Sequence, residues 1–272
     1  MKKLIPILVL SLSILSTTWA SHMVGGSIHY RCLDYSQYEV SIVNYRDCSG
    51  IPMVTSRFIN YQSTTCGASG IATLPLVSVQ EVTPICSQFT AQTTCNGGSF
   101  TGVQEYIYMD TIVLPQNCTD WVFFFNECCW NNSVVNINPG SGFHTQSTLN
   151  DFDYVCNSNV VFNGRGIMFA NQGQPNVYDP LGSDSDGDEL RFRLTSALQG
   201  LGAPVFYNGG YSGQNPLWNI NSFDTLTGRI AFTPIAIGSF VVAYDVEEYR
   251  NGDLIAVTHR VIQIVVGNYG VS

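Results

Sequence analysis

Hydrophobic and polar residues alternate in short runs along the first half of the chain. The runs are rich in Val, Ile, Tyr and Phe, and Gly, Pro and Asn separate them. No segment of comparable length keeps the period of a helix, so the pattern indicates strands. We expect these strands at residues 38–45, 56–61, 72–79, 105–114, 120–126 and 133–138.

The second half repeats the pattern with longer hydrophobic runs. Strands are expected at residues 189–197, 228–234, 238–250 and 254–266, and Asn251-Gly252 between the last two favours a tight hairpin turn. This spacing predicts an all-β protein of two β-sandwich domains with immunoglobulin-like, Greek-key connections. Gly, Ser, Thr and Asn replace the apolar alternation between about Pro139 and Leu149, where we expect the linker. The predicted domains are residues 21–145 and 146–272.

The first twenty residues have the pattern of a secretory signal peptide. Lys2 and Lys3 precede an apolar run from Leu4 to Leu15, and small residues flank the end at Ala20. No other run approaches the roughly 18 apolar residues that a membrane helix needs. The sequence therefore predicts a secreted, extracellular protein with no transmembrane segment.

Cysteines occur only in the first part of the chain, and the last 116 residues contain none. An exported protein meets an oxidising environment, so we expect four disulfides and one remaining cysteine in a disulfide-rich first domain. Spacing does not define the pairs. Cys128 and Cys129 are expected to point to opposite sides and to bridge different elements. The nine candidates are Cys32, Cys48, Cys66, Cys86, Cys95, Cys118, Cys128, Cys129 and Cys156.

Charge excludes nucleic acid as a partner. The formal net charge is −9, and every basic residue beyond Lys3 is an arginine with no cluster among them, so nothing could neutralise a row of phosphates. Charged residues make up only 11% of the chain. Neutral polar groups then supply the solubility, as is common in exported β-rich modules.

The sharpest local chemistry is the stretch GSDSDGDEL, in which three aspartates alternate with small residues. Asp184, Asp186 and Asp188 could turn their oxygens toward one point, and such an oxygen cage suits Ca²⁺. The alternative is an Asx-rich turn with solvated carboxylates and no ion. A second acidic cluster could supply distant ligands if its strand end meets the same loop: Asp245, Glu247 and Glu248.

Three classes of function remain open. No hydrolase, metalloprotease, P-loop or dinucleotide motif occurs, so we expect a structural or adhesive protein and not an enzyme. A carbohydrate-binding module is the alternative, with aromatic side chains as stacking platforms. An extracellular hydrolase using paired carboxylates, for instance Asp186 with Glu247, is the third hypothesis. The candidate platform residues are Trp130, Tyr207, Tyr211 and Trp218.

Several stretches resemble a known family when taken together: YRDC (45–48), CCWNN (128–132), SDSDGDELRFRL (183–194) and FVVAYDVEEYRNGDLIAVTHRVIQIVV (240–266). They are similar to the N-terminal region of large secreted surface proteins of gliding bacteria of the Bacteroidota, described as gliding-motility-associated or type IX secretion substrates. The resemblance implies a cadherin-like second domain with calcium at Asp184 to Asp188. It also implies a cell-surface location, with other surface proteins or extracellular polysaccharide as partners.

Overall fold

The computed structural model describes residues 22–269, so the expected signal peptide lies outside the described residues. Antiparallel strands form most of the described chain, and the only helices in this part are two short 3₁₀ segments, η1 (Ser87–Gln92) and η2 (Thr94–Asn96). The prediction of an all-β protein is confirmed. None of the helices within residues 22–269 has the length and apolar character needed to cross a bilayer.

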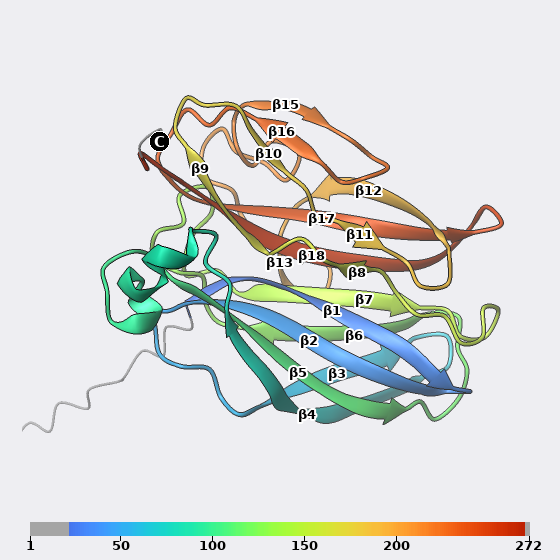
Figure 1. Ribbon diagram of the computed structural model, residues 1–272. Helices are drawn as coiled ribbons and strands as arrows, with labels where there is room; N and C mark the ends of the chain where they lie inside the picture. The colour runs from blue at the N-terminus through green and yellow to red at the C-terminus, as the bar shows by residue number, and fades with distance from the viewer. Residues whose placement is uncertain (1–21, 270–272) are drawn as a thin grey trace, which may run out of the picture.

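The first lobe, residues 22–149, consists of seven strands and lies in the lower half of Figure 1. Neighbouring strands follow the order β1-β2-β5-β4-β3-β6-β7, and all these pairs are antiparallel. The strands are β1 (Met23–Asp34), β2 (Gln37–Asp47), β3 (Ser56–Ser63), β4 (Ala68–Glu81), β5 (Val103–Val113), β6 (Trp121–Glu127) and β7 (Phe143–Leu149).

The second lobe, residues 150–269, has one long hairpin and many short strands. The β17–β18 hairpin is flanked by β12 on one side and by parallel β9 on the other. Small sheets β10-β16-β15 and β11-β8 also belong to the lobe, whereas β13 and β14 extend the large sheet from β7. The strands are β8 (Val161–Phe162), β9 (Ile167–Asn171), β10 (Asn176–Tyr178), β11 (Gly182–Ser183), β12 (Glu189–Thr195), β13 (Leu198–Gly200), β14 (Ala203–Pro204), β15 (Ile220–Phe223), β16 (Ile230–Phe232), β17 (Gly238–Arg250) and β18 (Asp253–Gly267).

The β17–β18 hairpin turns where the sequence predicts it. Asn251 and Gly252 have φ angles of 55° and 93°, and this left-handed conformation matches the twist of a tight hairpin. Both strands are long runs of buried residues with few polar interruptions. A run of this kind indicates a strand that is covered on both faces.

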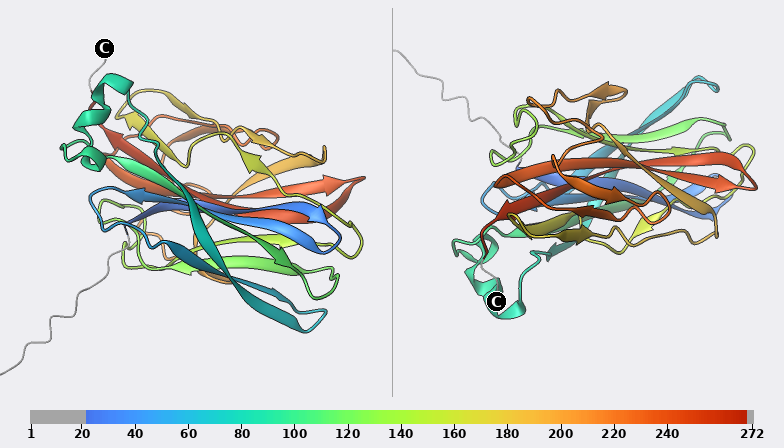
Figure 2. Two further views of the ribbon diagram at one scale, coloured as in Figure 1. Left: turned by 60° about the horizontal axis from the view of Figure 1, so that its bottom comes forward. Right: turned by 90° about the horizontal axis from the view of Figure 1, so that it is seen from above.

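The hairpin is indeed covered on both faces, and so it serves two cores. Val241, Ala243 and Val261 belong to the core of the first lobe, whereas Val242 and Ile262 belong to the core of the second. Alternate side chains of one strand thus point to opposite lobes, as the two-residue period of a strand requires. The central position of the hairpin between the lobes is visible in Figures 1 and 2.

Backbone pairing also crosses between the lobes. β18 pairs with β1 at Gly26↔Val261 and with β7 at Thr258↔Ser147. A Cβ atom on Gly25 would lie 2.4 Å from the carbonyl oxygen of Val261. Only glycine therefore allows β1 to approach β18 this closely. These two glycines also weaken the hydrophobic alternation, which explains why the sequence pattern did not predict β1.

The structure corrects two elements of the sequence prediction. The expected linker at 139–149 is wrong over most of its length, because Phe143–Leu149 is strand β7, which pairs with β6 and β18. The proposed boundary after residue 145 would thus cut a strand. Residues 133–138 form isolated bridges instead of a strand. There the Asn136 side chain donates from Nδ2 to the C=O of Val241 and accepts at Oδ1 from its N–H. These two side-chain hydrogen bonds replace the backbone pairs that a strand would form.

Four disulfides form within the described chain, as the cysteine count predicts. Three join separate elements: Cys32 with Cys156, Cys48 with Cys95, and Cys66 with Cys118. The expectation that Cys128 and Cys129 bridge different elements is wrong, because they pair with each other. Cys128 and Cys129 directly follow the end of β6. The other six paired cysteines form the three disulfides between separate elements. Cys86 is the exposed free cysteine.

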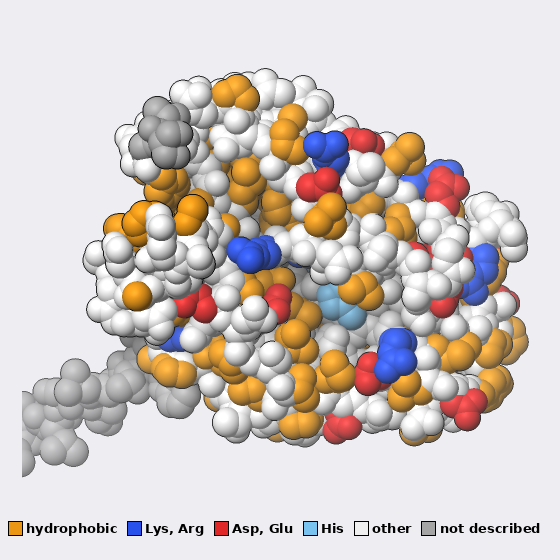
Figure 3. All heavy atoms as spheres, viewed as in Figure 1, with side chains coloured by type: hydrophobic (Ala, Val, Ile, Leu, Met, Phe, Trp, Pro, Cys, Tyr) orange, Lys and Arg blue, Asp and Glu red, His pale blue; other side chains and the backbone are white. Residues whose placement is uncertain are grey.

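Basic side chains do not gather into a patch on the face drawn in Figure 3. They lie singly or beside acidic side chains, and neutral polar atoms cover much of the remaining surface. This distribution agrees with the scattered arginines of the sequence. It offers no row of cations that could follow a phosphate backbone.

Replacement of Val261 or Ile262 by Ala tests the shared layer. Each truncation leaves a cavity on one face of β18, so each should lower the free energy of unfolding by roughly 1–4 kcal/mol. Because both cores share this strand, both variants should shift one common unfolding transition. Denaturant titrations followed by fluorescence and near-UV circular dichroism measure this shift.

The control is Leu254→Ala on the same strand, where the side chain is 50% exposed. This change should alter stability by less than about 0.5 kcal/mol. Two separate transitions, with each core variant moving only one of them, would contradict the shared layer.

Candidate functional site

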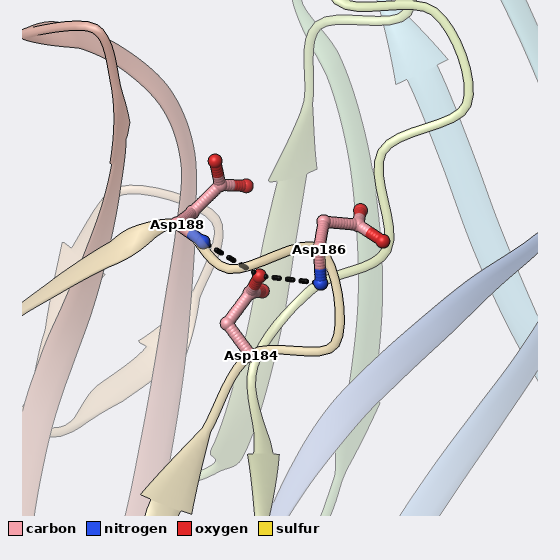
Figure 4. Close-up of side chains that lie close together, drawn as sticks. All are labelled: Asp184, Asp186 and Asp188. Carbon is pink, nitrogen blue, oxygen red and sulfur yellow. Dashed lines mark hydrogen bonds between the residues drawn. The ribbon is translucent and has the colours of Figure 1, made fainter.

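The three aspartates of the acidic stretch come together in the loop between β11 and β12. One carboxylate oxygen from each of Asp184, Asp186 and Asp188 lies within 4.8 Å of those of the other two. Figure 4 shows the three side chains along the turn of this loop. Gly187 has a φ of 84° and so permits the turn. The three aspartates singled out in the sequence thus lie close together in one loop.

Asp184 organises the loop from inside. Its Oδ1 accepts hydrogen bonds from the backbone N–H groups of Asp186 at 2.9 Å and Asp188 at 3.0 Å, drawn as dashed lines in Figure 4. The second oxygen, Oδ2, is buried and has no hydrogen-bond partner. Burial raises the pKa of the Asp184 carboxyl, while the two backbone N–H groups oppose this shift. The loop thus has an Asx-type turn and one carboxylate oxygen left without a donor.

Arg250 at the end of β17 is the counter-charge of the loop. Its Nε and Nη2 each donate to one oxygen of the Asp188 carboxylate at 2.7 Å. Nη2 also donates to Oδ1 of Asn157 at 2.6 Å. The Asp188 side chain is only 3% exposed, so this bidentate pair is shielded from water and strong for its kind. Asp186 accepts a further bond from the backbone N–H of Ser158 at 2.7 Å.

Glu248 closes the inner side of this cluster. It is fully buried; Oε1 accepts from the backbone N–H of Val160 at 2.8 Å and Oε2 from Nδ2 of Asn157 at 3.3 Å. Burial raises the pKa of Glu248 to about 8, and the nearby Asp184 and Asp188 carboxylates add to this shift against the Val160 N–H. Burial therefore favours the protonated form of this side chain at neutral pH.

The structure does not bring Asp245 and Glu247 to the loop. Both pair with Arg193 on β12, at 2.8 Å and 3.4 Å, and Asp245 also contacts Nδ1 of His259 at 2.7 Å. Odd-numbered residues of β17 point to the face opposite Glu248, so they cannot share a site with it. The pairing of Asp186 with Glu247 that the hydrolase hypothesis requires is likewise not formed.

Three residues of the cluster were not predicted as a set: Asn157, Glu248 and Arg250. From the sequence, Glu248 was grouped with Asp245 and Glu247, which lie on the opposite face of β17. A stricter use of strand alternation could have separated them, because the apolar positions Val242, Tyr244 and Val246 share the face of Glu248. No sequence pattern pointed to Asn157, which reaches the loop across 27 residues of chain from Asp184.

The aromatic residues of the carbohydrate hypothesis do not form one platform. Trp130 is 2% exposed and packs edge-to-face on Phe143. The Tyr207 hydroxyl accepts from the backbone N–H of Ala197. Tyr211 and Trp218 meet at an interplanar angle of 81°, so their faces are not aligned for one sugar ring.

Comparison with known protein families, curated proteins and solved structures returns no match to this chain.

Glu248 is expected to make stability depend on pH. Its pKa is raised from 4.5 to about 8 in the folded protein, so the folded state keeps a proton that the unfolded chain releases above pH 4.5. This contribution to the free energy of unfolding is complete below pH 4.5. It decreases by at most about 1.4 kcal/mol per pH unit as the pH rises toward 8.

Unfolding of the wild type and of Glu248→Gln, compared from pH 5 to pH 9 with EDTA present, measures this loss. The Gln variant lacks the titrating proton, so its stability should fall less steeply over this range. Identical slopes for the two proteins would disprove the assignment.

Proposed function

We propose that this protein is a secreted structural or adhesive module of a bacterial cell surface. The observation that carries the proposal is the β17–β18 hairpin, which is buried on both faces and joins two lobes into one cross-linked body. Three disulfides between separate elements add to this rigidity, and such bonds are typical of proteins that persist outside the cell. A body of this kind acts by presenting its surfaces.

The outer face of β3 and β4 is the surface that best fits an adhesive contact. Phe58 and Ile71 are 66% and 67% exposed, and Val77 on the same face of β4 is 53% exposed. Register pairs Phe58 with Thr73 and Asn60 with Ile71, so the two large apolar side chains are diagonal neighbours. Adjacent exposed apolar side chains on a rigid sheet are typical of protein contact sites. We infer that other cell-surface proteins bind this face.

A second part of the proposal concerns calcium at the acidic loop. The grouped oxygens of Asp184, Asp186 and Asp188 support it, as does the Asp184 oxygen that has no donor. Calcium prefers such a set of carboxylate oxygens. Binding would replace Arg250 as the principal counter-charge of Asp188. It would stiffen the loop where it contacts residues 157–160 of the same lobe.

The adhesive role is tested with the mature protein coupled to beads and applied to the cells that produce it. Substitution of both Phe58 and Ile71 by Ser removes the apolar side chains while keeping residues that strands tolerate. Retention of the beads under flow should fall by about tenfold or more, since loss of two anchor side chains costs roughly 2 kcal/mol or more of binding.

The control is Val113→Ser, which changes a side chain of 65% exposure at the end of β5. Retention of these beads should match the wild type. Equal retention of the double variant, or no retention of wild-type beads, would refute the adhesive role of this face.

Calcium binding is tested by thermal unfolding in EDTA and in millimolar CaCl₂. A ligand that binds only the folded state at 100 times its Kd stabilises by about 2.7 kcal/mol, and the wild-type midpoint should rise by several degrees. Asp184→Asn keeps an oxygen acceptor for the two loop N–H groups but removes the charge, so it should abolish the rise.

Asp110→Asn, at an exposed position on β5, should respond to calcium as the wild type does. An unchanged wild-type midpoint would show that the loop does not bind calcium. The loop would then be an Asx turn that pairs with Arg250.

A further inference from the structure

A cleft between the two lobes contains a buried arginine with unused donors. Its floor is the outer face of β1, β2 and β5, and its opposite wall comes from β8 and β18. The cleft has a volume of about 350 Å³, which lies within the range of small-molecule sites. Figure 3 shows a recess between the lobes on this face, with a histidine side chain visible in it. Its lining residues include Ser41, Tyr45, Glu105, Phe162 and Arg260.

Arg260 enters the cleft wall from β18 and is 1% exposed. Its Nη2 donates to the backbone carbonyl of Gly164 at 2.5 Å, but its Nε and Nη1 are buried without hydrogen-bond partners. Among residues 22–269, no Asp or Glu forms an ion pair with it. A buried guanidinium without a counter-charge is costly, and arginine cannot avoid this cost by losing its proton.

Aromatic rings lie beside the Arg260 guanidinium, and no carboxylate of residues 22–269 forms an ion pair with it. The Phe162 ring centre lies 4.1 Å from the guanidinium carbon. Burial raises the pKa of the Tyr45 and Tyr244 hydroxyls above their usual range, so these phenols are neutral. The π faces give partial compensation only. Glu105 lines the same cleft but forms no ion pair with Arg260, so the structure leaves room for a direct counter-ion from outside the chain.

His29 at the floor of the cleft does not compete for that anion. Its Nδ1 lies 2.8 Å from the carbonyl oxygen of Val160, which can only accept, so Nδ1 carries the proton and Nε2 accepts from the Ser27 hydroxyl at 2.7 Å. Burial lowers the pKa of His29 to about 4. The ring is therefore neutral and holds β1 against residue 160. Arg260 remains the one buried cation among the residues that line the cleft.

From this arrangement we propose that the cleft binds a small organic monocarboxylate, with Arg260 as its charge partner. A single charge fits better than a polyanion, because Glu105 and the exposed Arg31–Glu39 pair share the cleft and the whole chain carries a net charge of −9. Val43, Ile107 and Phe162 provide apolar contact for the body of the ligand.

Phe162 is the side chain that must turn aside, because its ring covers the guanidinium. It belongs to β8, which has only two residues and pairs with β11 alone among the described strands. Movement of this ring breaks no pairing of the large sheet. The residues that line the cleft include none of the acidic loop and none of β3 or β4.

Thermal unfolding with D-glucuronate, benzoate, D-glucose and sulfate as probes tests the proposal at constant ionic strength. A carboxylate should raise the wild-type midpoint by roughly 3 °C at a tenfold excess over its Kd, whereas neutral glucose and dianionic sulfate should not. A response to glucuronate alone would indicate the uronic acid units of a polysaccharide, and a response to benzoate alone would indicate a free aromatic acid. Either response supports the carboxylate site.

The decisive variant is Arg260→Met, which removes the charge and keeps the volume. It should bind the carboxylate roughly 10- to 100-fold more weakly, and its own midpoint should not fall, since it relieves a buried charge. Ser41→Phe fills the floor of the cleft and should abolish the response with Arg260 intact. Arg31→Gln, at the exposed side of the same cleft, should leave it unchanged.

Absence of any response to the carboxylates in the wild type would overturn the proposal. Wild-type affinity in both Arg260→Met and Ser41→Phe would overturn it equally, since binding would then occur elsewhere. Isothermal titration of each variant supplies the Kd, so the result does not depend on the stability of any one variant.

Discussion

Burial of the β17–β18 hairpin on both faces is the constraint on which the rest of the structure depends. Alternate side chains of one strand fill two different cores, as Val261 and Ile262 do. Neither lobe can then complete its core without the hairpin, and apolar burial is the main favourable term in folding. Gly25 follows from the same constraint, because β1 has to come close to β18 at this residue. The hairpin thus determines the spacing of both lobes.

This sharing also places polar groups between the lobes, where each must find a partner. Asn159 is 1% exposed and supplies hydrogen bonds to buried polar groups of several strands. Its Nδ2 donates to the carbonyl oxygen of Ile28 and to the hydroxyls of Ser147 and Thr258, and its Oδ1 accepts from the N–H of Tyr30. One amide therefore connects β1, β7 and β18. The Cys32–Cys156 bond lies close to it in sequence and fixes the same segment covalently.

Features that depend on residues close in sequence could be predicted from the sequence, and features that depend on distant residues could not. Alternation and the Asn-Gly turn are local, so the all-β class, the β17–β18 hairpin and nine of the ten predicted strands were correct, whereas the pattern missed nine strands of residues 22–269, most of them short. The linker prediction failed because β7 is polar on account of bonds to β18, which begins about a hundred residues later. At the acidic loop the three alternating aspartates were found, but Arg250 and Asn157 arrive from elsewhere in the fold. Pairing of Cys128 with Cys129 is another outcome that element-to-element reasoning missed.

The same hairpin carries two buried ionisable residues that solve the problem of burial differently. Glu248 on β17 can take up a proton, and burial raises its pKa to about 8, so it can become neutral without a counter-charge. Arg260 on β18 cannot become neutral. Its desolvation has to be offset by hydrogen bonds, aromatic faces or an anion, and the chain supplies one hydrogen bond and the rings around it. A carboxylate ligand in the adjacent cleft would provide what the fold leaves out. A buried arginine with idle donors beside a cavity is therefore stronger evidence for a ligand than a buried acid of equal burial.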